Sequence, residues 1–340
     1  MTSANTTAAI SSLETGRDLD QPQAYDLFRE IIAGDVPPEA LERVLVGLRD
    51  KGETPDEIAG AASAMRDAAT PFPRPDYPFA DTCGTGGDGA GSVNVSTAVA
   101  FVAAAAGVPV AKHGNRSVSS RCGSADVLEQ LGANLAPAPE VSRSALDDVG
   151  VCFLFAPQYH PGARHAAPVR KKIGTRTIFN VLGPLVNPAR PTIQVMGVYA
   201  SDLVPVAART LARMGCRSAL TVYGDGLDEI ALHGPTTAMR VAGDELDEMT
   251  LEPAALGVQP APTSALAGGG PQENAAWMRT LLGGGGSSAH RDAVAINAAP
   301  ILWLAGRAPS LLDAVDLAQQ TLASGEPQRR LDGFVERSHG

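Results

Sequence analysis

The sequence predicts an α/β protein, in which a small all-helical N-terminal domain precedes a larger domain with a largely parallel sheet flanked by helices. Apolar residues recur at helical spacing up to about residue 69. Beyond residue 76, short apolar runs alternate with helical patterns, which is typical of a parallel sheet. Of the 340 residues, 44% are apolar but only 4% are aromatic, which favours closely packed helices over an all-β sandwich.

The N-terminal part divides into a tail and a helical domain. Residues 1–19 are polar and rich in Thr and Ser, without the apolar segment of a signal peptide, so we expect a disordered tail. Residues 20–72 predict three short helices, and Thr54–Glu57 reads as a capping box with Pro55 at the first helical position. Two apolar faces support them: Tyr25, Phe28 and Ile32, and then Leu41, Val44, Leu45 and Leu48.

Residues 76–335 predict the α/β domain, after a proline-rich linker. We expect its helices at about 97–107, with Ser96 or Thr97 as N-cap, and at 124–131 and 203–214. The segment near 164–185 lies between two strands and is expected to cross back to the helical domain. The expected strands are 79–82, 108–111, 151–155, 192–198 and 218–223.

Composition excludes several classes of protein. The net charge of −10 argues against a nucleic-acid-binding surface. Residues 112–176 are the exception, with nine Lys/Arg against five Asp/Glu, and would attract a polyanion. The four cysteines form no C-x-x-C pair, so we expect a reducing, cytoplasmic location rather than a disulfide or zinc framework. No apolar run is long enough to predict a membrane span.

Two segments, one helix apart, have the chemistry of a phosphate site. Gly84–Asp88 follows a predicted strand, and its glycines allow several backbone N–H groups to converge on one anion. Lys112–Arg116 follows the next strand, and ligands of α/β sheets gather at such carboxyl ends. Taken alone, a glycine-rich turn before a helix is often only a tight connection. The Gly84–Asp88 loop matches neither the G-x-x-x-x-G-K-[ST] nor the G-x-G-x-x-G motif. The prediction of a phosphate site therefore rests on the occurrence of both segments one helix apart.

Five segments, GTGGDGAGSVNVST, AKHGNRSVSS, HPGARHAAPVR, TRTIFNVLGPLVNPAR and LDEIALHGPT, occur in an order and at separations that resemble the anthranilate phosphoribosyltransferase family. The resemblance covers about residues 22–325. It implies transfer of the phosphoribosyl group of phosphoribosyl pyrophosphate (PRPP) to the amine of anthranilate in tryptophan biosynthesis, with Mg²⁺ as cofactor. It also implies a homodimer that meets through the N-terminal helices.

The resemblance assigns the donor and metal sites by matching position. Ser96, Asp228 and Glu229 would bind Mg²⁺, whereas a D-E pair taken alone is usually only solvated. Lys112 and Asn115 would be catalytic, and Lys112 would compensate phosphate charge. The PRPP site would comprise Gly84, Thr85, Gly86, Gly87, Asp88, Ser92, Asn94, Val95, Ser96, Thr97, Lys112, Asn115, Arg116, Ser117, Ser119, Ser120 and Ser124.

For the acceptor, the same resemblance points to Arg170, whose guanidinium can hold a carboxylate through two hydrogen bonds. Gly84, Asn115 and His113 would border the same pocket, and His113 would orient the amine or take its proton unless it is only structural. Family members commonly carry an aromatic residue where this chain has Ala163. The smaller side chain would widen the acceptor channel or loosen acceptor binding, unless Tyr159 compensates.

Two other functions stay open on the sequence. A pyrimidine nucleoside phosphorylase shares the expected fold, but that family places Lys-His-Ser before Thr-Gly-Gly, where this chain has Thr82-Cys83-Gly84. The other is a non-catalytic relative that binds nucleic acid. The acidic balance and the Asp228-Glu229 pair argue against it.

Overall fold

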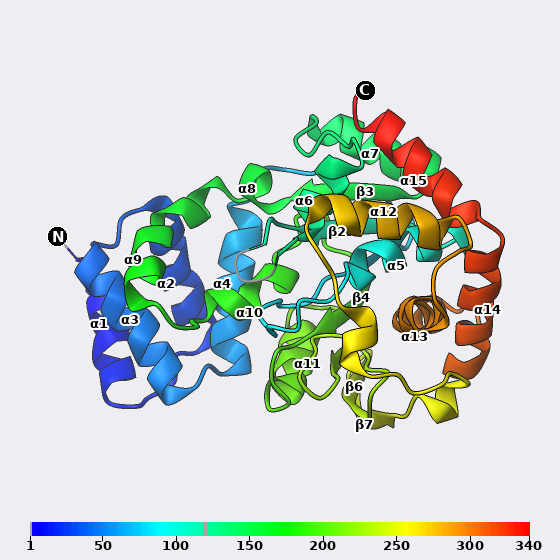
Figure 1. Ribbon diagram of the computed structural model, residues 1–340. Coiled ribbons are helices and arrows are strands. Elements are labelled where there is room, and N and C mark those ends of the chain that lie inside the picture. The colour runs from blue at the N-terminus through cyan, green and yellow to red at the C-terminus, as the bar shows by residue number, and fades with distance from the viewer. Residues whose placement is uncertain (1, 118–120) are drawn as a thin grey trace.

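The computed structural model describes residues 2–117 and 121–340 and contains an N-terminal helical part beside a larger α/β part (Figure 1). The helical part contains α1 (Ala4–Glu14), α2 (Gln21–Ala33), α3 (Pro38–Lys51) and α4 (Pro55–Asp67). The predicted capping box is present, since the Thr54 hydroxyl accepts from the Glu57 N–H and the Glu57 carboxylate accepts from the Thr54 N–H. All four apolar residues predicted on one face of α3 are buried: Leu41, Val44, Leu45 and Leu48.

The expectation of a disordered tail at residues 1–19 is wrong. Helix α1 begins after Ser3, whose hydroxyl accepts the Thr6 N–H as an N-cap. Ile10 and Leu13 are buried in the core of the helical part, and α1 packs on α2 and α3. The sequence of α1 contains few apolar residues among many Thr and Ser, so its helical pattern is weak. Its 11 residues nevertheless form about three turns, which is long enough to bury Ile10 and Leu13.

The larger part is built on one sheet of seven strands in the order β3-β2-β1-β4-β5-β6-β7. Neighbours among the first five strands in this order are parallel, and β6 and β7 add an antiparallel edge, which confirms the largely parallel sheet. The strands are β1 (Ala80–Thr82), β2 (Val110–Gly114), β3 (Val151–Phe155), β4 (Ile193–Gly197), β5 (Ser218–Tyr223), β6 (Thr236–Ala242) and β7 (Glu245–Leu251).

Helices cover the sheet and bury its apolar residues. Helix α5 (Val95–Ala105) is almost fully buried and packs against α13 (Ser288–Leu304), close to α15 (Glu326–Arg337) (Figure 1). On the N-terminal side, α11 (Leu203–Arg213) packs against both α4 and the sheet, so one apolar cluster runs from the helical part into the α/β part. Outside the connection from β3 to β4, the other helices are α6 (Ser124–Gln130), α7 (Pro139–Val149), α12 (Pro271–Leu282) and α14 (Leu311–Ala323), with 3₁₀ turns η2 (Ala254–Leu256) and η3 (Thr263–Leu266).

Two expected boundaries at the site are wrong. Helix α5 begins at Val95, so neither Ser96 nor Thr97 is its N-cap; Asn94 holds that position without a capping side-chain bond. Strand β2 does not end at Ala111 but continues to Gly114, because its backbone pairs with β3 through Gly114↔Phe155. Lys112 therefore projects from within the strand, and strand pairing outweighs the local preference that we read from the sequence.

The segment between β3 and β4 runs along the helical part. It contains α8 (Ala156–Tyr159), the 3₁₀ turn η1 (Pro161–His165), α9 (Ala167–Ile173) and α10 (Phe179–Leu185). The turn η1 packs on α2, α9 packs on α3, and α10 packs on α4. Within the described residues, no helix is both long enough and apolar enough to cross a membrane.

Candidate active site

The candidate site lies where the strand order reverses. From β1 the chain moves outward to β2 and β3, whereas β4 and β5 lie on the other side of β1. The segments that follow β1, β2, β4 and β5 all leave the sheet at the same edge, because these strands are parallel. Ligands of open α/β sheets bind at such a point. The glycine loop after β1 and the acidic pair after β5 meet here.

The glycine loop adopts a conformation that only its glycines allow. Gly86 and Gly87 have φ values of 65° and 74°, a region that residues with a Cβ rarely occupy. The Thr85 N–H donates to the Gly197 carbonyl of β4 at 2.9 Å, and the Gly86 N–H donates to the Asp228 carboxylate at 2.6 Å. The loop is therefore joined to the acidic pair by a direct hydrogen bond.

Asp228 and Glu229 place two carboxyl groups next to each other at this edge of the sheet. Burial, followed by the nearby Asp88 carboxylate, raises the pKa of Asp228 to about 6. Burial and the charge of Asp228 raise the pKa of Glu229 well above its usual value, although the Ser96 N–H and Lys112 oppose this shift. Carboxylates crowd together in this way where a cation is to be bound.

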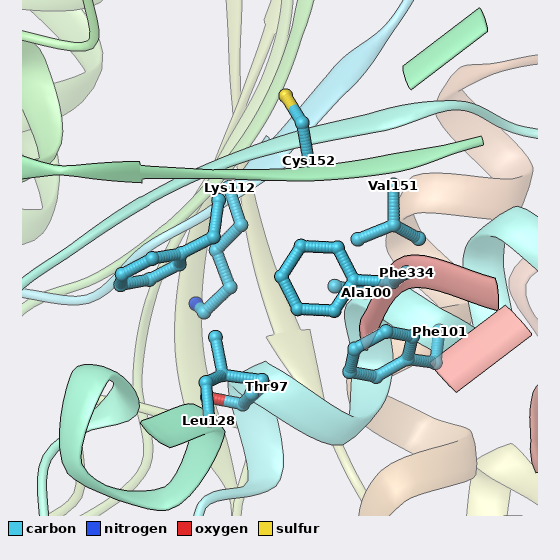
Figure 2. A pocket seen from close by; sticks show the side chains of 9 residues that line it. Thr97, Ala100, Phe101, Lys112, Leu128, Val151, Cys152 and Phe334 are labelled. Carbon is cyan, nitrogen blue, oxygen red and sulfur yellow. The ribbon is translucent and has the colours of Figure 1, made fainter. Parts of the chain in front are cut away.

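Lys112 is the cation that faces this group from β2. Its side chain is 3% exposed, and Nζ donates to the Thr82 carbonyl at 2.5 Å and to the Ser96 hydroxyl at 3.3 Å. Figure 2 shows Lys112 extending from the strand towards the first turn of α5, where Thr97 lies. The small hollow in that view is lined by Lys112 and Thr97 but not by Asp228, so it does not include the acidic pair.

The donor set fits Mg²⁺. Carboxylate and hydroxyl oxygens are hard ligands, and Mg²⁺ in proteins is commonly held by one or two carboxylates plus water and substrate phosphate. In the described part of the chain, no group of three or more His, Cys, Asp or Glu side chains surrounds one point closely enough to hold an ion alone. Asp228 and Glu229 would thus hold Mg²⁺ only together with substrate oxygens.

The start of α5 carries four more of the predicted donor residues, namely Asn94, Val95, Ser96 and Thr97. Ser96 is half-buried and near both Lys112 and Glu229. The Asn94 amide instead donates to the Cys122 carbonyl and accepts from Asn274 of α12. Val95 and Thr97 are buried at the base of the helix. Of these four residues, Ser96 is the one with contacts to the site, because its backbone N–H interacts with Glu229 and its hydroxyl accepts from Lys112.

The second predicted phosphate segment, Lys112–Arg116, and the serines that follow it offer fewer groups to a phosphate than expected. The Arg116 guanidinium is paired with Asp126 at 2.9 Å and with Glu129 at 2.7 Å on α6, so its charge is already compensated. Asn115 is exposed, and its carbonyl accepts from the Ser124 hydroxyl at 3.2 Å. Ser119 and Ser120 lie outside the described residues. Ser117 donates its N–H to Asp126. In this structure Lys112, not Arg116, supplies the positive charge next to the acidic pair.

The two acceptor residues lie in different surroundings. Arg170 of α9 is half-buried, with its guanidinium 5.1 Å from the centre of the Phe179 ring. His113 is 2% exposed, and its Nδ1 lies 3.0 Å from the Gly183 carbonyl, which fixes that nitrogen as the donor. Burial, followed by the neighbouring His160, lowers the pKa of His113 to about 3, so it is a weak base at neutral pH.

Tyr159 is a core residue. Its ring is fully buried and packs edge-on against Phe72, with 6.5 Å between the ring centres. Its compensation for Ala163 stays a prediction. Ala163 is half-buried and packs against the apolar cluster of the helical part.

Sequence reasoning missed two residues that shape the site. A Cβ on Gly197 would lie 1.5 Å from the Asp228 carbonyl oxygen, so the absence of a side chain lets the acidic loop approach β4. A glycine at the end of a buried strand was a readable signal for such an approach. Arg176, in the segment before α10, donates to the Gly87 carbonyl and stacks over Tyr199. No local pattern distinguishes Arg176 from the other bases of that segment.

The two parts of the chain match two family models. Residues 7–69 match the helical bundle domain of a glycosyl transferase family, and residues 76–328 match its a/b domain. The chain thus has the two-domain fold of this glycosyl transferase family.

The relatives are more specific. The chain is 60% identical over 331 residues to an anthranilate phosphoribosyltransferase of Sorangium cellulosum, covering 97% of this chain and 95% of that one. A crystal structure of the Thermus thermophilus enzyme of that name superposes with a TM-score of 0.93 at 44% identity, over 98% of this chain and 99% of that one. The Saccharomyces cerevisiae enzyme in complex with PRPP and Mg gives 0.90 at 27% identity, over 99% of each chain. This chain belongs to the anthranilate phosphoribosyltransferase family.

Proposed function

We propose that this protein transfers the phosphoribosyl group of PRPP to the amine of anthranilate, releasing pyrophosphate, as a step of tryptophan biosynthesis. The hydrogen bond from the Gly86 N–H to Asp228 is the observation that carries the proposal, because it joins the glycine loop to the acidic pair at one point. Membership of the family over nearly the whole chain supports the choice of donor and acceptor.

In the proposed reaction, the main task of the protein is to stabilise the charges that develop as the sugar–pyrophosphate bond breaks. When the C1–O bond of the sugar breaks, negative charge grows on the leaving pyrophosphate and positive charge grows on the sugar ring. In the proposed mechanism the pyrophosphate is stabilised by the buried Lys112 ammonium and by N–H groups of the glycine loop other than those of Thr85 and Gly86, which already donate within the chain. Mg²⁺, held by Asp228, Glu229 and Ser96, would neutralise phosphate charge when bound.

The acceptor needs positioning more than activation. An aromatic amine is unprotonated at neutral pH, so holding it near the sugar carbon can supply much of the rate. We propose that Arg170 binds the anthranilate carboxylate, with Gly84 and Asn115 beside the ring. His113 contributes through its place in the fold, because its low pKa makes it a poor base.

One assay tests the reaction. Anthranilate is fluorescent, and its signal should fall only when the protein, PRPP and Mg²⁺ are all present. Undiminished fluorescence under these conditions would contradict the proposed activity. Removal of Mg²⁺ with a chelator should stop the reaction, and added Mg²⁺ should restore it.

Arg170→Ala tests the acceptor site separately. Loss of a two-bond carboxylate contact should raise the anthranilate KM by about 100-fold or more, since hydrogen bonds to charged groups contribute about 1.5–3 kcal/mol each. The PRPP KM should change much less. Lys171→Ala, which removes an exposed charge one residue away, is the matched control. Equal effects of Arg170→Ala on both substrates would remove Arg170 from the acceptor site.

We also propose a homodimer formed through the N-terminal helices, and a cytoplasmic location. Cys83, Cys152 and Cys216 are free thiols, in keeping with a reducing compartment. Sedimentation analysis tests the dimer: a monomer at micromolar concentration would contradict it.

A further inference from the structure

We propose that Arg176 is a positioning residue for the donor site, which holds the glycine loop in its binding conformation through the Gly87 carbonyl. The inference rests on the proposed function, because it assigns to that loop the binding of the PRPP diphosphate. Arg176 lies between α9 and α10 and is therefore remote in sequence from the loop that it contacts.

The Arg176 guanidinium is fixed from two sides. One of its terminal nitrogens donates to the Gly87 carbonyl, and its central carbon lies 4.0 Å from the centre of the Tyr199 ring. Tyr199 follows β4 and is half-buried, so the ring is a firm support. A planar guanidinium can stack on a ring and donate in its own plane at the same time, which a lysine ammonium cannot do.

The segment that carries Arg176 is itself anchored. Thr175 accepts a hydrogen bond at 2.8 Å from Arg49 of α3, and α9 packs on the same helix. The contact at Gly87 thus joins the glycine loop to the helical part of the molecule. Arg170, the proposed acceptor residue, lies on α9, six positions before Arg176. Arg176 therefore connects the donor loop directly to the segment that follows α9.

The loop needs such support. Gly86, Gly87, Gly89 and Gly91 all have positive φ, and glycine-rich backbone loses much conformational freedom when it is ordered. The charge of Arg176 is also available. Arg176 forms no ion pair with a carboxylate in the parts of the chain that the structure describes. Many other Lys and Arg side chains do pair with Asp or Glu. A free cation beside a diphosphate site strengthens binding of the donor.

The test compares steady-state constants of Arg176→Ala with those of the wild type. We expect the PRPP KM to rise about tenfold, the anthranilate KM at saturating PRPP to stay within about twofold, and the melting temperature to fall by no more than about 2 °C. A merely structural side chain would lower the melting temperature or change both KM values alike. Lys171→Ala, which removes an exposed charge from the same segment, should leave all of these values unchanged.

The support from Tyr199 provides an independent test. Tyr199→Phe keeps the ring and should behave as the wild type, whereas Tyr199→Leu should raise the PRPP KM. The double variant Arg176→Ala/Tyr199→Leu should be no worse than Arg176→Ala alone, because the ring acts through the guanidinium. Guanidinium ion added at millimolar concentration should lower the PRPP KM of Arg176→Ala but not that of the wild type.

The outcomes separate this inference from the proposed reaction. An unchanged PRPP KM in Arg176→Ala, or fully additive effects in the double variant, would overturn the role of Arg176 while leaving the activity intact. If the wild type consumed no anthranilate, the proposed reaction would fail. Calorimetric titration of PRPP with Mg²⁺ into the wild type and Arg176→Ala would then decide the inference by itself: equal affinities would overturn it, and about tenfold weaker binding would support it.

Discussion

Gly197→Ala gives the sharpest test of how the acidic loop is positioned. The added Cβ would lie 1.5 Å from the Asp228 carbonyl oxygen and 2.3 Å from its carbonyl carbon, whereas real Cβ atoms essentially never approach closer than 3.0 Å. Both contacts are with backbone, so no rotation of a side chain can relieve them. Either β4 or the acidic loop must therefore move by roughly 1.5 Å, and a misplacement of about 1 Å can cost about 100-fold in rate.

The expected result is a selective loss of activity. Overpacking at a buried position costs about 1–3 kcal/mol in stability, which a domain of ordinary stability survives. We therefore expect a folded Gly197→Ala variant whose kcat/KM for PRPP, measured by anthranilate fluorescence at saturating Mg²⁺, is about 100-fold below that of the wild type. The displaced Asp228 carboxylate would lose its hydrogen bond from the Gly86 N–H.

Gly234→Ala is the matched control. Gly234 lies in the β5–β6 connection, which also carries Asp228. Its φ is accessible to alanine, and a Cβ there would meet no atom within 4 Å. It should keep activity within about twofold, since surface substitutions away from special features change little. If folded Gly197→Ala retained activity within about threefold of the wild type, the close approach of β4 to Asp228 would not matter for catalysis, and the reasoning would be refuted.

Three further predictions concern charge, the first helix and pH. Lys112→Met should lower kcat/KM for PRPP by about 100-fold or more, as for loss of one electrostatic donor at a reacting centre, whereas Arg116→Met should cost less than about fivefold because its charge is already paired with Glu129. Leu13→Ala should destabilise the protein by about 3 kcal/mol in chemical denaturation, because Leu13 is 3% exposed; no loss would contradict a packed α1. His113 has a pKa of about 3 in the fold against about 6.5 when unfolded, so the stability it contributes is complete above pH 6.5 and is lost as pH falls towards 3, by up to about 1.4 kcal/mol per unit. Thermal unfolding between pH 7.5 and 4.5 should therefore show a smaller acid loss for His113→Gln than for the wild type; equal losses would contradict a neutral buried imidazole.

Local chemistry made several elements readable. The Thr54–Glu57 capping box and the apolar face at Leu41–Leu48 are short-range patterns, and both lie in the structure where the sequence predicted them. The glycines after β1 were readable for the same reason, since positive φ is a property of single residues. In contrast, α1 was missed because its stability comes from packing on α2 and α3, which no window of eleven residues reveals.

The sequence by itself determined which residue types reach the carboxyl edge of the sheet, because that depends on local strand and turn preferences and on short motifs. Only the tertiary structure decided their partners: Arg116 turns to Glu129, Lys112 turns to Ser96, and Arg176 meets a loop 89 residues earlier in the chain. Such choices depend on which strands become neighbours, and strand order is set by the packing of the whole sheet and its helices rather than by any local preference.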